Sequence, residues 1–419
     1  MMELSNIGQK MNKMSGVRAI MADINETLAK SGGKHFYNLS AGNPVVLPEV
    51  RDLWKRYLKK LIDTREFDQV FCRYGGSIGY IPFIKAVCKL YKNHYGWNIG
   101  IKNVLVTPGS QKLYFYIINS FAGSSADGIK KVLFPLAPEY IGYSNQAVEE
   151  DTLISFKPKI DILGEHEYKY RPDFDNLKIG DDVGVVLLSR PTNPTGNVVT
   201  DEELKKIIAL AKDVPVVIDS AYAPPIPNLC FTDMTPQYGD NVIHSFSLSK
   251  AGMPGARIGV AIGHEKYISA MEAFQANTCL HSPTLGQAVA AHAFNSGELE
   301  QISKDVIQKF YLNKKKLAVK TVKNSFNPKI PYYIHKAEGT LFMWLWFRDL
   351  PVSCMKFYEM IKKEDTIVVP GEDFFPGIGE WQHKNECIRV SFTASDEDLV
   401  EGLKRIGRVA QKVYSSQKI

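Results

Sequence analysis

The sequence lacks the paired cysteines and histidines from which small disulfide-bonded and metal-binding proteins are built. Its nine histidines contain no H-x-x-x-H pair, and its six cysteines contain no C-x-x-C pair, since they stand at positions 72, 88, 230, 279, 354 and 387. We therefore expect no disulfide framework, no zinc ribbon and no metal site. Scattered single thiols are typical of proteins from a reducing compartment.

Long apolar segments and strongly charged segments are also missing. Residues 1–20 contain no apolar signal core, and the longest apolar run, Leu341 to Phe347, is too short to cross a bilayer. The net charge of +6 is spread along the chain, and its densest basic run, at residues 314–316, has no interleaved aromatic residues. We expect a cytoplasmic protein that binds neither membranes nor nucleic acids.

What the chain does contain is the pattern of a large α/β protein. It has 419 residues, of which 45% are hydrophobic and 23% charged, which is ordinary for a globular chain of about two domains. Short β-branched segments alternate with helical patterns, and this alternation predicts a mostly parallel sheet between helices. The predicted strands are Val104–Val106, Val132–Phe134, Val183–Leu188, Val216–Ile218, Val242–Phe246 and Ile258–Ile262.

The C-terminal third has a different pattern, which predicts a second domain. A long helix is expected over residues 298–326, strands over 339–347 and 387–393, and a last helix over 397–415. The N-terminal segment up to about Pro48 is expected to join this part. The resulting division is a large domain over 49–299 and a smaller, discontinuous α+β domain over 1–48 and 300–419.

Polar residues follow five of the predicted strands, at the point where each strand ends. These segments are Thr107–Gln111, Pro135–Tyr140, Ser189–Gly196, Asp219–Tyr222 and Ser247–Lys250. In open α/β sheets, ligands bind beyond the carboxyl ends of the strands. The five segments therefore predict one shared site.

The last of these segments, together with Arg257, indicates the chemistry of that site. A buried lysine such as Lys250 can form a Schiff base with an aldehyde. Ser247 and Arg257 can hold a phosphate, the arginine through charge-assisted hydrogen bonds. Pyridoxal 5′-phosphate carries both an aldehyde and a phosphate, and it is the cofactor that this segment predicts.

The whole set of motifs resembles that of the fold-type I pyridoxal-phosphate aminotransferases of class I/II. Among these, longer strings are most similar to the bacterial valine–pyruvate aminotransferases, and the resemblance extends from the first helix to the last. The strings are LFPLAPEYIGY, SRPTNPTGNVVTDEEL, HKAEGTLFMWLWF and VVPGEDFFPG. The resemblance implies the fold-type I architecture, a homodimer, and transfer of an amino group between amino acids and 2-oxo acids.

The resemblance also implies a catalytic role for three residues. Lys250 matches the lysine that carries the cofactor and moves the Cα proton of the substrate. Asp219 matches the aspartate that keeps the pyridine nitrogen protonated, so that the ring accepts electrons. Tyr222 matches the tyrosine that hydrogen-bonds the ring hydroxyl. Asn193, a binding residue rather than a catalytic one, matches the amide that bonds the same hydroxyl.

Further residues match positions that hold the cofactor and the substrate. By resemblance, Ser247, Arg257 and the amides of Ser110 and Gln111, which follow the turn at Gly109, bind the phosphate. Tyr140 matches the aromatic residue that stacks on the ring, and Tyr74 the tyrosine that reaches the site of the partner subunit. Arg389 matches the arginine that binds the substrate carboxylate, and Gly42 a backbone contact to the same group; Asn193 borders this substrate site as well.

For the substrate we expect small aliphatic pairs, such as valine or alanine with pyruvate or 2-oxoisovalerate. A dicarboxylate would need a second cation, and residues 275–287 supply none. Arg73 and Arg190 lie near the motifs in sequence and leave that alternative open. Aminotransferases of broader or aromatic specificity and pyridoxal-phosphate lyases or decarboxylases also remain open, because their cofactor sites look alike.

Two alternatives lie outside the enzymes of this fold. A cofactor-sensing regulator would usually carry an added DNA-binding module, and we see no segment of that size. Gly75 to Gly79 satisfies G-x-S-x-G, the nucleophile elbow of serine hydrolases, with Ser77 as nucleophile. The hydrolase interpretation leaves Asp219, Lys250 and the other motif residues unexplained.

Overall fold

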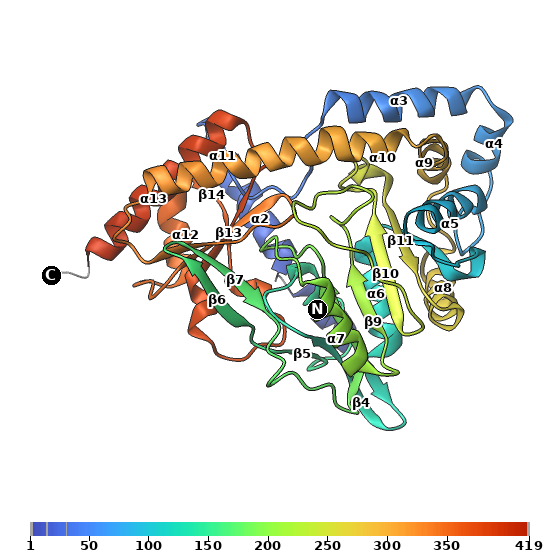
Figure 1. Cartoon of the computed structure of the whole chain (residues 1–419), viewed down its shortest axis with the longest axis horizontal. Helices are drawn as coiled ribbons and strands as arrows, with labels where there is room; N and C mark the ends of the chain where they lie inside the picture. Colours follow the sequence, from blue (N-terminus) through green and yellow to red (C-terminus); the bar gives the residue numbers. More distant parts are fainter. Residues whose placement is uncertain (1–2, 14–15, 31, 417–419) are drawn as a thin grey trace.

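A mixed sheet of eight strands forms the centre of the larger part of the molecule (Figure 1). The computed structural model describes residues 3–13, 16–30 and 32–416. The strand order is β2-β11-β10-β9-β8-β4-β3, with β5 paired to β4. The strands are β2 (Val104–Pro108), β3 (Gly123–Ser125), β4 (Gly128–Phe134), β5 (Leu153–Ser155), β8 (Val183–Ser189), β9 (Val216–Asp219), β10 (Val242–Ser247) and β11 (Ile258–Ile262).

This sheet confirms the predicted α/β class and all six predicted strands. Strands β4, β8, β9 and β10 are parallel to one another. β11 is antiparallel to both β10 and β2, so β2 has the same direction as β10. The carboxyl ends of β2, β4, β8, β9 and β10 therefore lie at one edge of the sheet, and the polar segments that follow them meet there.

Helices cover both faces of the sheet, as the burial of its strands requires. Leu105 and Val132 point to the face covered by α6 and α8, whereas Val104, Val106 and Leu133 point to the other face. The helices of this part are α3 (Pro48–Ile62), α4 (Arg65–Phe71), α5 (Ile81–Tyr95), α6 (Ser110–Phe121), α7 (Asp201–Ala211), α8 (Glu265–Cys279) and α9 (Leu285–Ser296).

A second sheet of six strands forms the smaller part, with the order β15-β16-β13-β12-β7-β6. Its strands are β6 (Lys159–Gly164), β7 (Glu167–Arg171), β12 (Tyr332–His335), β13 (Phe342–Phe347), β15 (Val369–Pro370) and β16 (Cys387–Ser391). The β6–β7 hairpin comes from the middle of the stretch expected in the large domain, yet it pairs with β12 through Glu167 and Tyr168. The sequence pattern did not indicate this hairpin, because its partner strand is more than 160 residues away.

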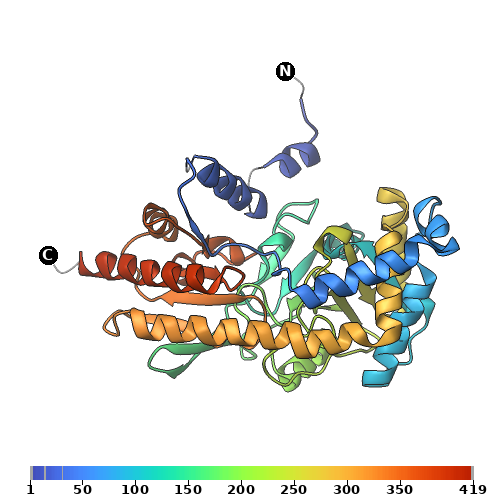
Figure 2. The same ribbon diagram turned by 90° about the horizontal axis from the view of Figure 1, so that it is seen from above.

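Helices from the C-terminal third of the chain pack against the second sheet, whereas the helix nearest the N-terminus stands away from both sheets (Figures 1 and 2). The predicted helix over 298–326 is present as α10 (Glu298–Ile302), a π-helical turn at Ser303–Gln308, and α11 (Lys309–Ser325). The predicted last helix is α13 (Asp396–Ser415), and α12 (Cys354–Lys363) lies beside it. From the other end of the chain, β1 (Tyr37–Asn38) pairs with β14 (Thr366–Ile367), after helices α1 (Asn6–Asn12) and α2 (Gly16–Ala29).

Over the ranges that the structure describes, no helix combines the length and the apolar character that a transmembrane span requires.

Candidate active site

A cavity of about 500 Å³ lies at the carboxyl ends of the central strands, between the two sheets. The structure brings most of the predicted site residues together on its wall. These are Gly42, Ser110, Gln111, Tyr140, Asn193, Asp219, Tyr222, Ser247, Lys250, Arg257 and Arg389.

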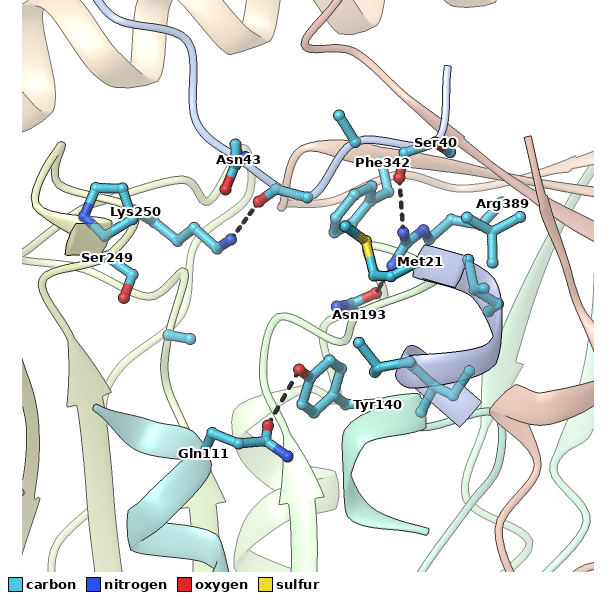
Figure 3. Close-up of a pocket in the computed structure, with 18 of the residues that line it drawn as sticks. Met21, Ser40, Asn43, Gln111, Tyr140, Asn193, Ser249, Lys250, Phe342 and Arg389 are labelled. Carbon is cyan, nitrogen blue, oxygen red and sulfur yellow. Dashed lines mark hydrogen bonds between the residues drawn. The ribbon is translucent and has the colours of Figure 1, made fainter. Parts of the chain in front are cut away.

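Lys250 follows β10 and reaches into this cavity (Figure 3). Its Nζ donates to the carbonyl of Gly42 at 2.5 Å and lies 5.8 Å from the centre of the Tyr222 ring. Burial, and then the charges of Arg389 and Arg257, lower the pKa of the Lys250 amine to about 8. A lysine with such a pKa is partly neutral near pH 8, which is the form that attacks an aldehyde.

Asp219 ends β9 at the bottom of the cavity. Its Oδ1 accepts from the Ala221 amide at 3.0 Å, and its Oδ2 accepts from the Tyr143 hydroxyl at 2.6 Å. Burial raises the pKa of this carboxyl, and the Tyr143 bond is the largest of the interactions that oppose the rise. The Tyr143 hydroxyl and the Ala221 amide thus hold the Asp219 carboxylate in place.

A group of donors next to Lys250 could hold a phosphate. Helix α6 begins at Ser110, directly after Gly109, whose φ of +85° lets the chain turn from β2 into the helix. A Cβ at Gly109 would lie 2.3 Å from Nη2 of Arg257, so a side chain there would displace the guanidinium from its present place. The exposed amides at the start of α6, the Arg257 guanidinium and the Ser247 and Ser249 hydroxyls face one corner of the cavity.

Arg389 comes from the second sheet and lies at the opposite end of the cavity (Figure 3). Its Nη1 donates to Asn193 Oδ1 and its Nη2 to the Ser40 carbonyl, both at 3.0 Å. The guanidinium carbon lies 4.1 Å from the Phe342 ring centre. Burial lowers the pKa of Arg389 to about 10. Its Nε is buried, and no hydrogen-bond partner for it occurs in the described ranges.

Two aromatic side chains complete the wall on the sheet side. The Tyr140 hydroxyl donates to Gln111 Oε1 at 3.2 Å, and the Tyr140 ring meets that of Tyr143 edge-on at 5.3 Å. Burial raises the pKa of both Tyr140 and Tyr222. These phenols therefore stay protonated and can donate hydrogen bonds at neutral pH.

Comparison with known proteins identifies the family. Residues 34–406 match the family described as aminotransferase class I and II. This chain belongs to that family.

Individual relatives agree with this assignment over nearly the whole chain. The valine–pyruvate aminotransferase of Escherichia coli K12 is 37% identical over 418 residues, which is 99% of each chain. A putative amino-acid aminotransferase from Psychrobacter arcticum superimposes with a TM-score of 0.94 at 36% identity, covering 99% of both chains. The valine–pyruvate aminotransferase of Salmonella typhimurium gives a TM-score of 0.87 at 35% identity, covering 96% of this chain and all of the other.

Aminotransferases of class I and II use pyridoxal 5′-phosphate as their cofactor. The residues of the cavity fit this group. Ser110 Oγ is buried, and within the described part of the chain it has no hydrogen-bond partner; it stands in the corner formed by Arg257 and the start of α6. Lys250, whose pKa is lowered, and the buried carboxylate of Asp219 face the same space. The donors at one end thus suit a phosphate, and the Asp219 carboxylate at the other end can accept a hydrogen bond from a protonated ring nitrogen.

Helix α2 forms a wall of the aminotransferase cavity that sequence reasoning missed. Its residues on one face line the opening at a spacing of three and four: Val17, Ile20, Met21, Ile24, Asn25 and Leu28. The Met21 side chain points into the space between Lys250 and Arg389 (Figure 3) and is 50% exposed. The apolar periodicity of residues 17–28 was a signal for an amphipathic helix, but its place above the site depends on the tertiary structure.

Tyr143, Ser249, Phe342 and Phe374 were also missed. Tyr143 contacts Asp219 from behind the cavity wall, and the other three line the wall directly. Tyr143 and Ser249 stand within three residues of predicted site residues, so a wider interpretation of the same motifs would have included them.

Two predicted positions lie apart from the cavity wall. Gly109 supports it only through the turn into α6. Tyr74 is 86% exposed and packs edge-on against His281 at 6.0 Å, so its predicted reach into a partner subunit stays a prediction.

Arg190 and Ser77, on which the dicarboxylate and hydrolase alternatives depended, do not have the surroundings that those functions require. Arg190 is buried and pairs with Asp201, while its Nε donates to the Val199 carbonyl at 2.6 Å; it does not line the cavity. Ser77 donates to Glu272 at 2.6 Å, and the segment before it is helix α4 rather than a strand. The strand–turn–helix context of a nucleophile elbow is therefore missing at Ser77.

Proposed function

We propose that this aminotransferase exchanges an amino group between a small aliphatic amino acid, such as valine or alanine, and a 2-oxo acid, such as pyruvate or 2-oxoisovalerate. The observation that carries the substrate class is the cavity wall itself. One guanidinium, Arg389, stands at the substrate end, and the apolar face of α2 stands beside it. The printed names of the Escherichia coli and Salmonella relatives support the same pair of substrates.

Lys250 is the residue proposed to hold the cofactor and to move the proton. When bound, pyridoxal phosphate supplies an aldehyde for the amino group and a ring that takes up negative charge from the substrate. Lys250 Nζ, with its pKa lowered to about 8, would accept the Cα proton of the substrate and hold it for return. An amine that is partly neutral near the working pH suits both directions of this transfer.

Asp219 is proposed to hold a proton at the ring nitrogen. A buried carboxylate close to that nitrogen favours its protonated form. The bonds from Tyr143 and Ala221 keep the carboxylate in place. Asp219 and Tyr222 thereby act electrostatically, with no change in their own covalent state.

Binding of the cofactor is proposed to use the remaining residues around Lys250. Ser247, Arg257 and the first turn of α6, from Gly109 to Gln111, hold the phosphate, since these donors converge in one corner. Asn193 and Tyr222 would hold the ring hydroxyl by hydrogen bonds, and Tyr140 would pack against the ring. The resemblance to the family motifs supports each of these roles, and their common place around the cavity agrees with it.

Arg389 is proposed to bind the substrate carboxylate. Its guanidinium is stacked on Phe342 and held by Asn193 and Ser40, so its direction is set before the substrate arrives. The buried Nε, which has no hydrogen-bond partner among the described residues, and the Gly42 backbone, next to Lys250, offer further polar contacts. Orientation by Arg389 would bring the Cα proton towards Lys250.

A dicarboxylate substrate is disfavoured by the charges around the cavity. A second carboxylate needs a cation of its own, and Arg190 is already engaged in the buried pair with Asp201. The face of α2 that lines the opening carries five apolar residues and one asparagine. An apolar wall discriminates weakly between substrates that differ by one methylene, by about 1–3 kcal/mol, so valine, alanine and 2-aminobutyrate should overlap.

The working form is proposed to be a homodimer. Tyr74, Phe71 and Leu280 are exposed, and they lie on neighbouring segments, since Thr284 donates to the Val70 carbonyl at 2.6 Å. Exposed apolar residues that gather in this way mark a protein interface. In a dimer covering this surface, Tyr74 would reach the phosphate end of the partner's cavity.

We propose the cytoplasm as the compartment. All six cysteines are free thiols, and free thiols persist where the surroundings are reducing.

The substrate assignment is tested with the cofactor-loaded enzyme and one fixed acceptor, pyruvate. We expect kcat/KM for valine and 2-aminobutyrate to differ by no more than about 10–200-fold, the range for one methylene in an apolar pocket. With 2-oxoisovalerate as the fixed acceptor, alanine should fall in the same range. Aspartate or phenylalanine exceeding valine and alanine by tenfold would overturn the small aliphatic class and leave the family assignment intact.

A further inference from the structure

Glu139 is a buried acid that none of the proposed catalytic roles uses. It follows β4, directly before Tyr140, and has no exposed surface. Its Oε1 accepts from the Ser189 amide at 2.8 Å, and its Oε2 accepts from the Ser189 hydroxyl at 2.5 Å and from the Tyr140 amide at 3.3 Å. Across the described ranges, the ion pairs include none with Glu139.

Such a carboxyl does little for stability. Taking an acid out of water without a cation costs free energy, and hydrogen bonds return only part of it. Burial raises the pKa of Glu139 to about 8 in spite of the Ser189 bonds. An apolar side chain of similar size would fill the same space without this cost, so the hydrogen bonds themselves require an explanation.

The bonds of residue 139 join three walls of the cavity. Its side chain ties the loop that carries Tyr140 to Ser189, the last residue of β8. Its backbone amide donates to the Phe374 carbonyl at 2.8 Å, and the Phe374 ring lies 5.2 Å from the Arg389 guanidinium.

Ser189 in turn leads to two further groups of the site. The Thr192 hydroxyl, next to Asn193, donates to the Ser189 carbonyl at 2.7 Å. The next residue, Arg190, donates its amide to the Asp219 carbonyl at 2.8 Å. A shift at Ser189 would therefore move both the Asn193 turn and the end of β9.

We propose that Glu139 is a positioning residue, which fixes the Tyr140 loop to the end of β8 and so sets where Tyr140, Asn193 and Arg389 stand across the cavity. The proposal rests on the proposed function of the cavity, since those three residues matter only if the cofactor and the substrate bind between them. It differs from a purely structural role, in which Glu139 would hold the fold together and leave the site unaffected once the protein is folded.

Two substitutions separate the bonds from the volume of the side chain. Glu139→Gln keeps the shape: its Oε1 can accept from the Ser189 amide, and its Nε2 can donate to the Ser189 hydroxyl. Glu139→Leu keeps most of the volume and loses every side-chain bond. Ser189→Ala removes the hydroxyl alone and covers the case in which Glu139→Leu fails to fold.

The chain offers a matched control at its surface. Glu149 accepts from the amide and the hydroxyl of Ser124, which is the same pair of contacts far from the cavity. Glu149→Gln and Glu149→Leu should leave cofactor affinity, KM and kcat within about twofold of the original enzyme.

If Glu139 is a positioning residue, the melting temperature of Glu139→Leu should lie within a few degrees of that of the original enzyme, because an apolar side chain replaces an uncompensated acid. Its kcat/KM should fall ten- to a hundredfold, with KM for both substrates raised. Its dissociation constant for pyridoxal phosphate, measured by equilibrium dialysis against the apoenzyme, should rise by at least threefold. Glu139→Gln should restore these values to within about threefold, and Ser189→Ala should fall between the two.

A folded Glu139→Leu enzyme with unchanged KM, kcat and cofactor affinity would overturn the proposal, as would a loss of melting temperature with normal kinetics of the folded fraction. If Glu139→Leu does not fold, unchanged kinetics in Ser189→Ala would overturn it. The cofactor readouts need no amino acid. If the original enzyme binds the cofactor at Lys250 yet does not use valine and pyruvate, the proposed substrates fail while dialysis and the circular dichroism of the bound cofactor still test Glu139.

Discussion

The floor and the roof of the cavity are built in opposite ways. The floor consists of the strand ends around Asp219, where buried side chains are held by sheet hydrogen bonds and by donors such as Tyr143. The roof is the apolar face of α2, where Val17, Met21 and Leu28 are 39%, 50% and 39% exposed. Asp23 fastens α2 to the rest of the chain through Tyr358 and Lys362, each at 2.7 Å.

This difference assigns different tasks to the two sides. Groups that stabilise charge work best when they are fixed before the reaction, which the sheet provides. An apolar wall needs only to exclude water and to fit the side chain of the substrate, which a lightly attached helix can do. Changes to the floor should therefore alter the chemistry, and changes to the roof should alter the choice of substrate.

The largest effect is expected from Lys250→Ala. Loss of the amine removes both the covalent attachment and the proton carrier, so kcat should fall by roughly 10²–10⁴-fold or more. Borohydride reduction followed by peptide mapping should fix the cofactor on Lys250 in the original enzyme and nowhere in the variant. The exposed Lys266, replaced by alanine, is the control. A label on another lysine would contradict the assignment of the site.

Asp219→Asn should rank second. The amide keeps the size of the side chain but loses the negative charge that stabilises a protonated ring nitrogen. The expected loss in kcat is about 10²–10³-fold, on the scale of removing one preorganised electrostatic group, with a smaller change in cofactor affinity. Single-turnover kinetics at saturating amino acid measure this, and a variant within tenfold of the original enzyme would place Asp219 outside the chemistry.

Burial of Lys250 in the floor of the cavity should lower the free energy of unfolding of the apoenzyme. The pKa of Lys250 is about 8 in the folded chain, against a reference value of 10.5. Between these values the unfolded chain binds more protons than the folded chain, so stability rises with pH. Lys250→Met should thus be more stable than the original apoenzyme at pH 7, by on the order of 1–3 kcal/mol.

Urea unfolding of the two apoproteins from pH 7 to pH 10.5 tests this expectation. The advantage of Lys250→Met should shrink as the pH rises through 8 and vanish near 10.5. Other titrating groups are the same in both chains, so the difference isolates Lys250. An advantage that does not change with pH would contradict a lowered pKa.

The smallest effect is expected from the roof. Met21→Ser removes apolar surface from the α2 wall, and kcat/KM for valine should fall by roughly three- to tenfold, with less change for alanine. Cofactor affinity should not change. Ala22→Ser, on the same helix but away from the cavity, is the control. Equal losses for valine and alanine would show that α2 does not contact the substrate side chain.

A subunit-mixing experiment tests whether Tyr74 of one subunit contributes to the cavity of its partner. Hybrids of a Tyr74→Phe chain with a Lys250→Ala chain would place both defects in one site and leave the other site intact. Recovery of activity above both parents is expected if Tyr74 serves the partner subunit. Equal activity of the parents and the mixture, after confirmed exchange of subunits, would place the whole site within one chain.

The sequence by itself determined the floor. Short β-branched strands and the polar segments after them are local patterns that can be recognised along the chain. Because the carboxyl ends of parallel strands share an edge, these patterns were enough to predict that Asp219, Asn193 and Lys250 lie together. The family match extends well beyond these segments, over residues 34–406.

Only the tertiary structure decided the roof, the addition of the β6–β7 hairpin to the second sheet, and the joints between the walls. The β6–β7 hairpin joins a strand more than 160 residues away, α2 lies over the cavity although its sequence shows only an amphipathic pattern, and Glu139 meets Ser189 from 50 residues away. In the sequence alone, Glu139 is one acid in a loop. Its contacts depend on the pairing of β4 with β8, and such long-range pairings leave no local periodicity that a sequence could display.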